Sequence, residues 1–211
     1  AIVPFAVTNS TLAGNSAGDG GGIFSTADVV LTFTTVTGNS AALPPGDVTG
    51  PGVVGGVAAE GEIELAASVV LGNAGENAPD PNVGAASVNA DGSLSDPAID
   101  LADVFQLDTE GAPDLAGNGT EKAAGRPGAL AEGLRELIPT VALAESAANP
   151  ALGIARADET DTDQRGEPRP ATFPVDLPLA DAGAFEVQPP PLSNDIVIGV
   201  NSGSSDPSLP A

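Results

Sequence analysis

The segment Asn9-Ser10-Thr11-Leu12-Ala13-Gly14-Asn15-Ser16-Ala17 occurs three times in the chain with its pattern preserved. It returns as Phe33-Thr34-Thr35-Val36-Thr37-Gly38-Asn39-Ser40-Ala41 and again as Ala67-Ser68-Val69-Val70-Leu71-Gly72-Asn73-Ala74-Gly75. The second spacing is longer than the first, which is expected where one repeat carries a loop insertion. The stretch Leu43–Pro51, with three prolines, is the obvious insertion.

The residues between these copies repeat in the same register. Gly20–Phe24 matches Val54–Ala58, and Val29–Thr32 matches Ile63–Ala66. Each repeat therefore reads as a Gly-rich turn, two short strands and a Gly-Asn turn. The strands alternate apolar residues with small or polar ones, as burial of one face requires.

Stacking of these repeats explains why the spacing is kept. A single coil cannot bury its inner face, but stacked coils share one core, with equivalent residues about 4.8 Å apart. We therefore expect Asn15, Asn39 and Asn73 to form a side-chain ladder at a turn. The glycines before them, Gly14, Gly38 and Gly72, should have positive φ. The alternative is that these are ordinary turn residues of a β-sandwich, whose strands do not repeat their turn sequences. The predicted fold is an all-β parallel solenoid.

The charge balance excludes some partners. Twenty-nine acidic residues against six basic ones give a formal charge of −23. Binding of nucleic acid or of an anionic membrane requires Lys and Arg, so both are excluded. Molar salt would screen the self-repulsion, so the charge indicates a solubility adaptation to a salty, halophilic habitat. The alternative explanation of the negative charge, and the more specific one, is that the acidic residues bind Ca²⁺.

The residue types that the sequence lacks limit the kinds of catalytic and binding site that it can form. The chain has no Cys, so disulfides and thiol chemistry do not contribute, and no His, the commonest general base and metal ligand. It also lacks Trp and Tyr, on which sugar rings usually stack. No apolar stretch reaches the roughly 18 residues of a membrane span. Because the chain opens on Ala1 with no signal-like segment, we expect a processed form or a fragment.

Several motifs resemble a known family of surface proteins. The Gly20–Phe24 element, followed by a strand and a Gly-Asn turn, resembles the polymorphic outer-membrane-protein repeat. Thr162–Pro170 together with Asp181–Glu186 resembles the terminal signature of bacterial choice-of-anchor Q β-helix proteins. Asn149–Gly153 resembles the element that precedes this signature in the family. The signature residues here are Asp163, Gln164, Arg165, Gly166 and Phe185.

The resemblance covers about residues 5 to 187 and implies a pectin-lyase-like, right-handed parallel β-helix on a secreted or surface protein. Two features depart from the family pattern. Ala180 stands where family members usually carry a Cys, and a helical insertion follows the Asn118-Gly119 turn.

The remaining segments complete the expected organisation. The solenoid domain spans 1–187, with a short helical insertion at about 121–138 near its C-terminal end. Ala129–Ile138 has one apolar face, which favours a cap or a flank of the solenoid over a docking helix for a partner. Residues 188–211 form a Pro-rich linker, a terminal strand at Asp195–Val200 and a tail. This strand could pair with the apolar stretch Ile2–Val7 of another copy, which would give head-to-tail self-association. The alternative is that the strand only leads to a missing anchor.

The sequence contains no recognisable catalytic motif. The weak metal candidates are Asp158, Glu159, Asp161 and Asp163, with Arg165 beside them. Their spacing does not fit an EF-hand loop, and an acidic turn paired to Arg165 is the preferred interpretation. A Ser-His-Asp arrangement is impossible without His, and no P-loop or dinucleotide fingerprint is present. Asn9-Ser10-Thr11 and Asn118-Gly119-Thr120 fit glycosylation sequons.

These observations favour a non-catalytic extracellular or cell-surface protein: a stalk, an adhesin or a fibre subunit. The expected partners are other copies of the chain or a cell-envelope polymer, and no cofactor is expected apart from the Ca²⁺ alternative. The competing hypothesis is a polysaccharide lyase or hydrolase of the β-helix type. A lateral groove with converging acids beside an Arg would favour the enzyme.

Overall fold

The computed structural model describes residues 3–45, 52–113, 140–156, 160–169 and 179–188. These residues form an all-β fold of stacked parallel strands, which confirms the fold prediction at that level. The strands of the stack are β1 (Phe5–Thr8), β2 (Thr11–Ala13), β3 (Ser16–Ala17), β4 (Ile23–Ser25), β5 (Val29–Thr32), β6 (Thr35–Thr37), β7 (Ser40–Ala41), β8 (Val57–Ala59), β9 (Glu62–Ala66), β10 (Val69–Leu71), β11 (Ala74–Gly75), β12 (Val83–Gly84) and β13 (Ser87–Asp91).

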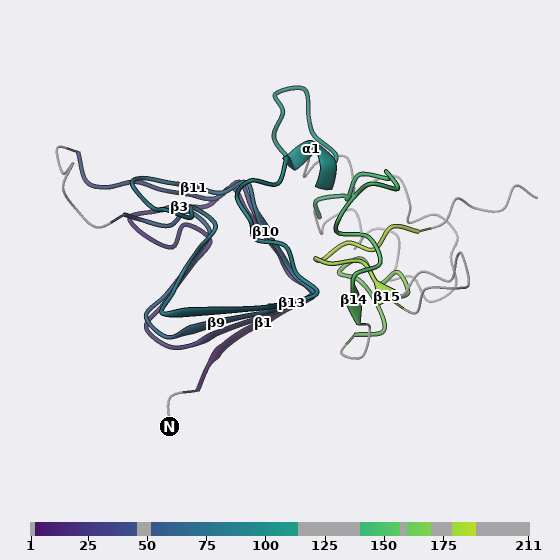
Figure 1. Cartoon of the computed structure of the whole chain (residues 1–211), viewed down its shortest axis with the longest axis horizontal. Coiled ribbons are helices and arrows are strands. Elements are labelled where there is room, and N and C mark those ends of the chain that lie inside the picture. The colour runs from purple at the N-terminus through teal and green to yellow at the C-terminus, as the bar shows by residue number, and fades with distance from the viewer. Residues whose placement is uncertain (1–2, 46–51, 114–139, 157–159, 170–178, 189–211) are drawn as a thin grey trace, which may run out of the picture.

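The thirteen strands belong to four parallel sheets that surround a common interior (Figure 1). The sheets have the strand orders β1-β5-β9-β13, β2-β6-β10, β3-β7-β11 and β4-β8-β12. Each set of four successive strands, which we call a coil, therefore adds one strand to every sheet. Coils 1, 2 and 3 begin with β1, β5 and β9, and β13 begins an incomplete coil 4.

The register between coils is the one predicted from the repeats. Ile23 pairs with Val57, and Val29 pairs with Ile63. In the sheet of the Gly-Asn turns, Leu12, Val36 and Val70 lie opposite one another. The matched sequence segments are therefore neighbours in space.

Alternation along each strand fills the interior. In β9, Ile63 and Leu65 are buried, whereas Glu62 and Glu64 are exposed. The interior cluster consists of aliphatic side chains from three of the four sheets, all except β3-β7-β11, namely Ile23, Val29, Leu31, Val36, Val57, Ile63, Leu65, Val70 and Val83. Each fully buried aliphatic side chain contributes about 1.5–3 kcal/mol, so stacking supplies most of the stability of this region.

The C-terminal segments cover the outer face of the β2-β6-β10 sheet (Figure 1). Val69 and Leu71 point outward into a second cluster, which includes Phe105, Leu143 and Phe185. Two further strands, β14 (Ala155–Arg156) and β15 (Leu179–Ala180), pair antiparallel in this region. Because both faces of the sheet are covered, β10 is apolar on both sides, as is typical of parallel strands, whereas β6 places the buried Thr35 and Thr37 on the side opposite Val36.

A single short helix, α1 (Leu101–Val104), occurs among the described residues, and the sequence analysis did not predict it. Asp100 is its N-cap, and the Asp100 carboxylate accepts a hydrogen bond from the backbone N–H of Ala102 at 3.0 Å. In the described part of the chain no helix has the length and apolar character needed to cross a membrane. The predicted insertion at 121–138 and the predicted strand Asp195–Val200 lie outside the described residues.

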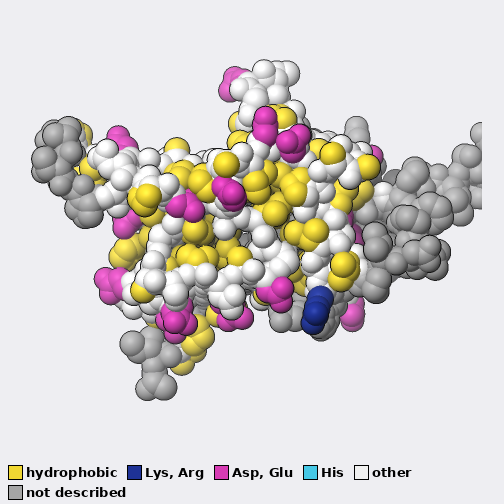
Figure 2. All heavy atoms as spheres, viewed as in Figure 1, with side chains coloured by type: hydrophobic (Ala, Val, Ile, Leu, Met, Phe, Trp, Pro, Cys, Tyr) yellow, Lys and Arg dark blue, Asp and Glu magenta, His cyan; other side chains and the backbone are white. Residues whose placement is uncertain are grey.

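The two ends of the stack expose apolar side chains. The exposed fractions are 80% for Val3, 50% for Phe5 and 54% for Phe24 in the first coil, and 42% for Val88 in β13. Figure 2 looks onto the β13 end and shows hydrophobic side chains gathered over the middle, with acidic side chains scattered around them. The rim of this end is therefore acidic and its centre apolar.

Candidate functional site

The Gly-Asn turns lie directly above one another and their asparagines are hydrogen bonded. Nδ2 of Asn15 donates to Oδ1 of Asn39 at 3.0 Å, and Nδ2 of Asn39 donates to Oδ1 of Asn73 at 3.0 Å. The backbone N–H groups of Asn15 and Asn39 donate to the same two oxygens, at 3.0 and 3.1 Å. Gly14, Gly38 and Gly72 have φ of 70°, 63° and 69°. The structure thus brings together all six predicted ladder residues.

A fourth amide, Asn82, ends the ladder, and the sequence analysis missed it. Nδ2 of Asn73 donates to Oδ1 of Asn82 at 3.2 Å, and Asn82 in turn donates to the carbonyl of Ser95 at 3.2 Å. Asn82 follows no glycine and occupies the sheet position of Gly56, because Val83 pairs with Val57. A Cβ at Gly56 would lie 2.9 Å from Nδ2 of Asn73, so this position faces the ladder directly.

The other corner of each coil has positive φ at residues that are not glycine. Between the first and second strands of coils 1, 2 and 3, Asn9, Phe33 and Ala67 have φ of 51°, 47° and 52°. Gly92 follows β13 in the same place with φ of 54°. Positive φ is costly for a bulky residue, so packing must hold Phe33 in this conformation.

The amide of Asn9 is engaged, which bears on its glycosylation sequon. Its Nδ2 donates to the carbonyl of Thr162 at 3.1 Å. A glycan would have to be attached to this nitrogen, which is held against the C-terminal segment. In this conformation glycosylation would require this hydrogen bond to break. The second sequon, Asn118–Thr120, lies outside the described residues.

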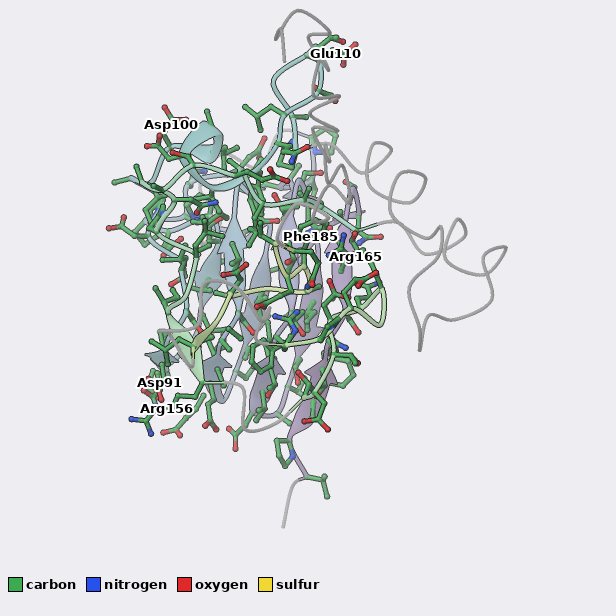
Figure 3. All side chains as sticks on the ribbon, turned by 90° about the vertical axis from the view of Figure 1, so that its right-hand side faces the viewer. Asp91, Asp100, Glu110, Arg156, Arg165 and Phe185 are labelled. Carbon is green, nitrogen blue, oxygen red and sulfur yellow. The ribbon has the colours of Figure 1, made fainter. Side chains whose placement is uncertain are left out.

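Residues 160–169 and 179–188 form a unit that we call the clasp, because it lies across the side of the stack. The terminal-signature residues all belong to it, and Figure 3 shows Arg165 and Phe185 close together on this side. The Arg165 guanidinium lies 3.6 Å from the centroid of the Phe185 ring and 2.6 Å from Oδ2 of Asp163. Arg165 also donates to the carbonyl of Glu186 at 2.7 Å.

A second arginine, Arg169, joins the clasp to the coil corners. It donates to Oε2 of Glu186 at 3.2 Å and to the carbonyl of Gly183 at 2.7 Å. Its guanidinium lies 4.4 Å from the centroid of the Phe33 ring. Phe33 is only 1% exposed, so the strained corner of coil 2 is held beneath this arginine.

Hydrogen bonds fasten the clasp to coils 1, 2 and 3. Thr11 of coil 1 donates to Oε1 of Gln164 at 2.7 Å. Thr35 of coil 2 accepts from the backbone N–H of Ala184 at 2.9 Å, and Ala67 of coil 3 accepts from Gly183 at 2.8 Å. The clasp therefore spans the stack along its length.

Burial changes the protonation equilibria of two clasp residues. Burial raises the pKa of Asp181 above its ordinary value, although the backbone N–H groups of Val187 and Gly153 and the charge of Arg169 oppose this rise. Burial likewise lowers the pKa of Arg169, against the opposing charges of Glu186, Asp163 and Asp181. Both shifts follow from the cost of holding a charge away from water.

The metal candidates do not form a cation site in the part of the chain that the structure describes. Asp163 accepts from the backbone N–H groups of Arg165, Glu167 and Glu186 and twice from the Arg165 side chain. These donors occupy the roughly four lone-pair positions of a carboxylate, so the candidacy of Asp163 is wrong for this conformation. Asp161 is exposed, and among the described residues no three acidic side chains are grouped closely enough to hold a metal. Asp158 and Glu159 lie outside the described residues.

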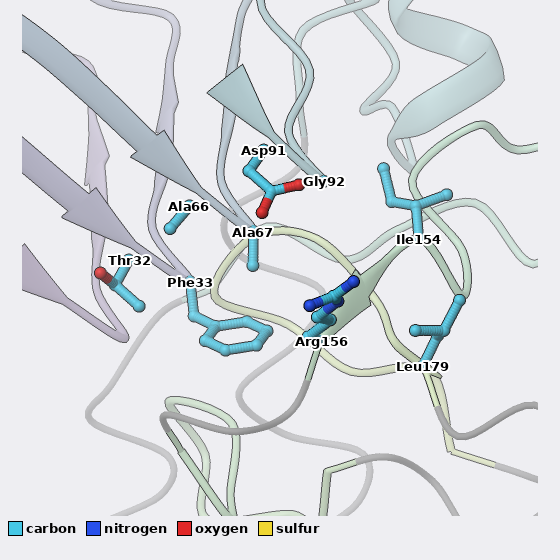
Figure 4. A pocket seen from close by; sticks show the side chains of 9 residues that line it. All are labelled: Thr32, Phe33, Ala66, Ala67, Asp91, Gly92, Ile154, Arg156 and Leu179. Atoms are coloured by element: carbon cyan, nitrogen blue, oxygen red, sulfur yellow. The ribbon is translucent and has the colours of Figure 1, made fainter. Parts of the chain in front are cut away.

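A groove of about 420 Å³ lies between the coil corners and the β14–β15 pair (Figure 4). One wall consists of the corner residues Thr32, Phe33, Ala66, Ala67, Asp91 and Gly92, and the other of Ile154, Arg156 and Leu179. Asp91 and Arg156 are its two charged side chains among the described residues, and they come from opposite walls. Both are exposed.

Comparisons of the chain with protein-family models, with curated proteins and with solved structures find no match. The resemblance to the choice-of-anchor Q and polymorphic outer-membrane-protein families therefore stays a prediction. The position of the family's missing Cys can nevertheless be described. Ala180 is fully buried and packs with Phe33, Ala67 and Ala155, so a small apolar side chain fills this site.

Proposed function

We propose that the chain is a segment of a right-handed parallel β-solenoid with a non-catalytic, extracellular or cell-surface structural role. Such a segment would serve as a stalk, an adhesin or a fibre subunit. The observation that carries the proposal is the ladder of amide hydrogen bonds, which joins coils 1, 2 and 3 through Asn15, Asn39 and Asn73 and ends at Asn82 within coil 3. Hydrogen bonds between the strands of successive coils and the clasp along one side support a rigid body.

The distribution of charged groups supports a structural role over a catalytic one. The buried carboxylate of Asp163 accepts only N–H donors of the clasp, so it serves to hold the fold together. The groove has a single acid, Asp91, opposite a single base, Arg156, among its described lining residues. General acid–base hydrolysis of a sugar uses two carboxylates that flank the scissile bond. A surface location agrees with the formal charge of −23, which keeps the molecule soluble in salt.

Two measurements test this proposal. Antibodies against the chain should label intact cells of the source organism and should not require permeabilisation. Incubation of the purified protein with acidic and neutral polysaccharides, with Ca²⁺ or with a chelator, should release neither reducing ends nor unsaturated sugars. Labelling that requires permeabilised cells would overturn the surface assignment.

The groove gives the competing hypothesis, a carbohydrate-active enzyme, a definite location. If a polysaccharide is cleaved, the variants Asp91→Asn and Arg156→Ala should each lower the rate by at least tenfold, as expected when a group that stabilises the transition state is removed. Glu64→Gln is the matched control, because Glu64 is exposed on β9 and does not line the groove. Cleavage that depends on Asp91 and Arg156 would replace the structural proposal by the enzyme.

A further inference from the structure

The first and last strands of the largest sheet present edges without a neighbouring strand. In the order β1-β5-β9-β13, β1 and β13 are the edge strands among the described residues. Natural proteins usually protect such edges with charged residues or prolines inside the strand, because an open edge pairs with another chain. Phe5–Thr8 contains no charged residue and no proline, and Ser87–Asp91 contains only Asp91. Within these two described strands, therefore, neither edge carries an internal proline or more than one charge.

The interior of the stack also opens at these two strands. Phe5, Val29, Ile63 and Val88 occupy one column, because each pairs with the next across the sheet. The middle members are buried, whereas Phe5 is 50% exposed and Val88 is 42% exposed. The same column of core side chains is therefore half uncovered at both ends.

We propose that a second copy of this chain covers these ends, with β1 of one copy added as a parallel strand to β13 of the next. The inference deepens the proposed structural function and rests on it. Continuation of the observed register places Phe5 against Val88, Val7 against Ala90 and Thr8 against Asp91. Large side chains of one end thus meet smaller ones of the other, and no two charged residues of these strands face each other. The contact is heterologous, so it propagates and does not close on a dimer.

The net charge determines how the contact responds to salt. Each copy carries −23, so long-range repulsion opposes association at low ionic strength. At about 1 M salt the Debye length is near 3 Å and the apolar edge contact prevails. Association should therefore strengthen with salt, the reverse of an interface formed by ion pairs.

Two blocked variants give the decisive test. Phe5→Asp blocks the β1 edge and leaves β13 intact, whereas Val88→Asp blocks β13 and leaves β1 intact. Sedimentation of the whole chain from 0.05 to 3 M NaCl should show growing oligomers for the wild type and monomers for each variant alone. An equimolar mixture of the two variants should form a heterodimer and nothing larger. Phe24→Asp is the matched control, since Phe24 is 54% exposed in coil 1 but lies in another sheet, and it should associate like the wild type.

A second measurement does not depend on how well the charged variants fold. Because the chain has no Cys, Ala6→Cys and Asn89→Cys introduce single thiols at positions that the proposed register brings together. Oxidation of the mixture should give a 1:1 disulfide-linked dimer, and Ala6→Cys alone should give none. A monomeric wild type at 3 M NaCl, a homodimer of Val88→Asp, or equal loss of association in Phe24→Asp would overturn the inference. Each of these results leaves the proposed structural function standing as long as no polysaccharide is cleaved.

Discussion

The coil stack and the clasp both bury polar groups, but they satisfy them in different ways. The stack uses neutral amides that repeat from coil to coil, so the middle asparagine, Asn39, accepts from Asn15 and donates to Asn73. The clasp uses charges that do not repeat, and each of its two guanidiniums pairs with one buried carboxylate, Arg165 with Asp163 and Arg169 with Glu186. A neutral ladder loses little stability when the asparagine at its end is replaced. A charged cluster leaves an unpaired ion wherever one partner is removed.

This difference also separates the tasks of the two regions. The ladder holds neighbouring coils in register, and the clasp fixes the stack from the side. Because the clasp contacts three coils at once, its loss would uncover the outer face of the β2-β6-β10 sheet, where Val69 and Leu71 are buried. The charged region should therefore give the larger losses of stability.

Removal of the buried Arg169 should have the largest effect. Arg169→Ala leaves Glu186 and the carbonyl of Gly183 without this donor, and loss of one partner of a buried pair costs about 3–5 kcal/mol. The measurement is the free energy of unfolding in urea. Arg156→Ala is the control, because Arg156 is exposed, and it should change that free energy by less than about 0.5 kcal/mol.

A double variant sharpens the same comparison. Arg169→Met combined with Glu186→Gln removes both charges, so its cost should be smaller than that of Arg169→Met alone. If the double variant is less stable than Arg169→Met, then the unpaired Glu186 carboxylate is not what destabilises Arg169→Met, and the explanation by an uncompensated charge is wrong.

A break in the middle of the ladder should have the next largest effect. Asn39→Ala removes the acceptor of Asn15 and the donor to Asn73, and unsatisfied buried polar groups cost about 1–3 kcal/mol each. Asn15→Ala should cost less, because Asn15 is exposed at the end of the ladder. Asn89→Ala, on the exposed strand β13, is the control. Equal losses for Asn39→Ala and Asn15→Ala would contradict a ladder whose strength depends on burial.

The sequence predicted the coil register because the repeats are local patterns. Leu12, Val36 and Val70 could be aligned from their Gly-Asn turns alone, and the structure pairs them. Asn82 could not be found in this way, because it replaces a glycine of a different strand and reaches the ladder from there. Its signal was an asparagine where Gly22 and Gly56 stand in the earlier coils.

The corner and the clasp show where sequence patterns carry less information. Positive φ at Phe33 and Ala67 has no local signature, since neither residue type favours it. Asp163 is the carboxylate that pairs with Arg165, and a pairing of Arg165 with the acidic turn was expected from proximity in the chain. The pairing of Arg169 with Glu186 was not, because it depends on how two separate segments meet on the side of the stack.

Substitution of Gly183 would show how closely the clasp packs against the β2-β6-β10 sheet. Its φ is 92°, and a Cβ would lie 2.7 Å from Oγ1 of Thr35 and 3.3 Å from Cγ2 of Val69. Gly183→Ala should therefore cost about 1–3 kcal/mol in the free energy of unfolding. Gly111→Ala separates strain from contact, because Gly111 has φ of 83° with open space around it, and it should cost less. Equal costs would mean that backbone strain alone decides both sites.

The pH dependence of stability should give the smallest effect, and it distinguishes the charged clasp from the neutral ladder. The pKa of Asp181 is raised in the folded state, so the folded protein holds this proton more tightly than the unfolded chain, where the pKa is near 3.9. The stabilising contribution is thus complete below about pH 4 and is lost as pH rises through the folded-state pKa. The free energy of unfolding of the wild type should therefore fall relative to that of Asp181→Asn over this window. Asn39→Ala, in the uncharged ladder, should show no such trend. A difference between wild type and Asp181→Asn that stays constant with pH would mean that the hydrogen bonds from Gly153 and Val187 offset burial completely, so that the pKa of Asp181 is the same in the folded and unfolded chain.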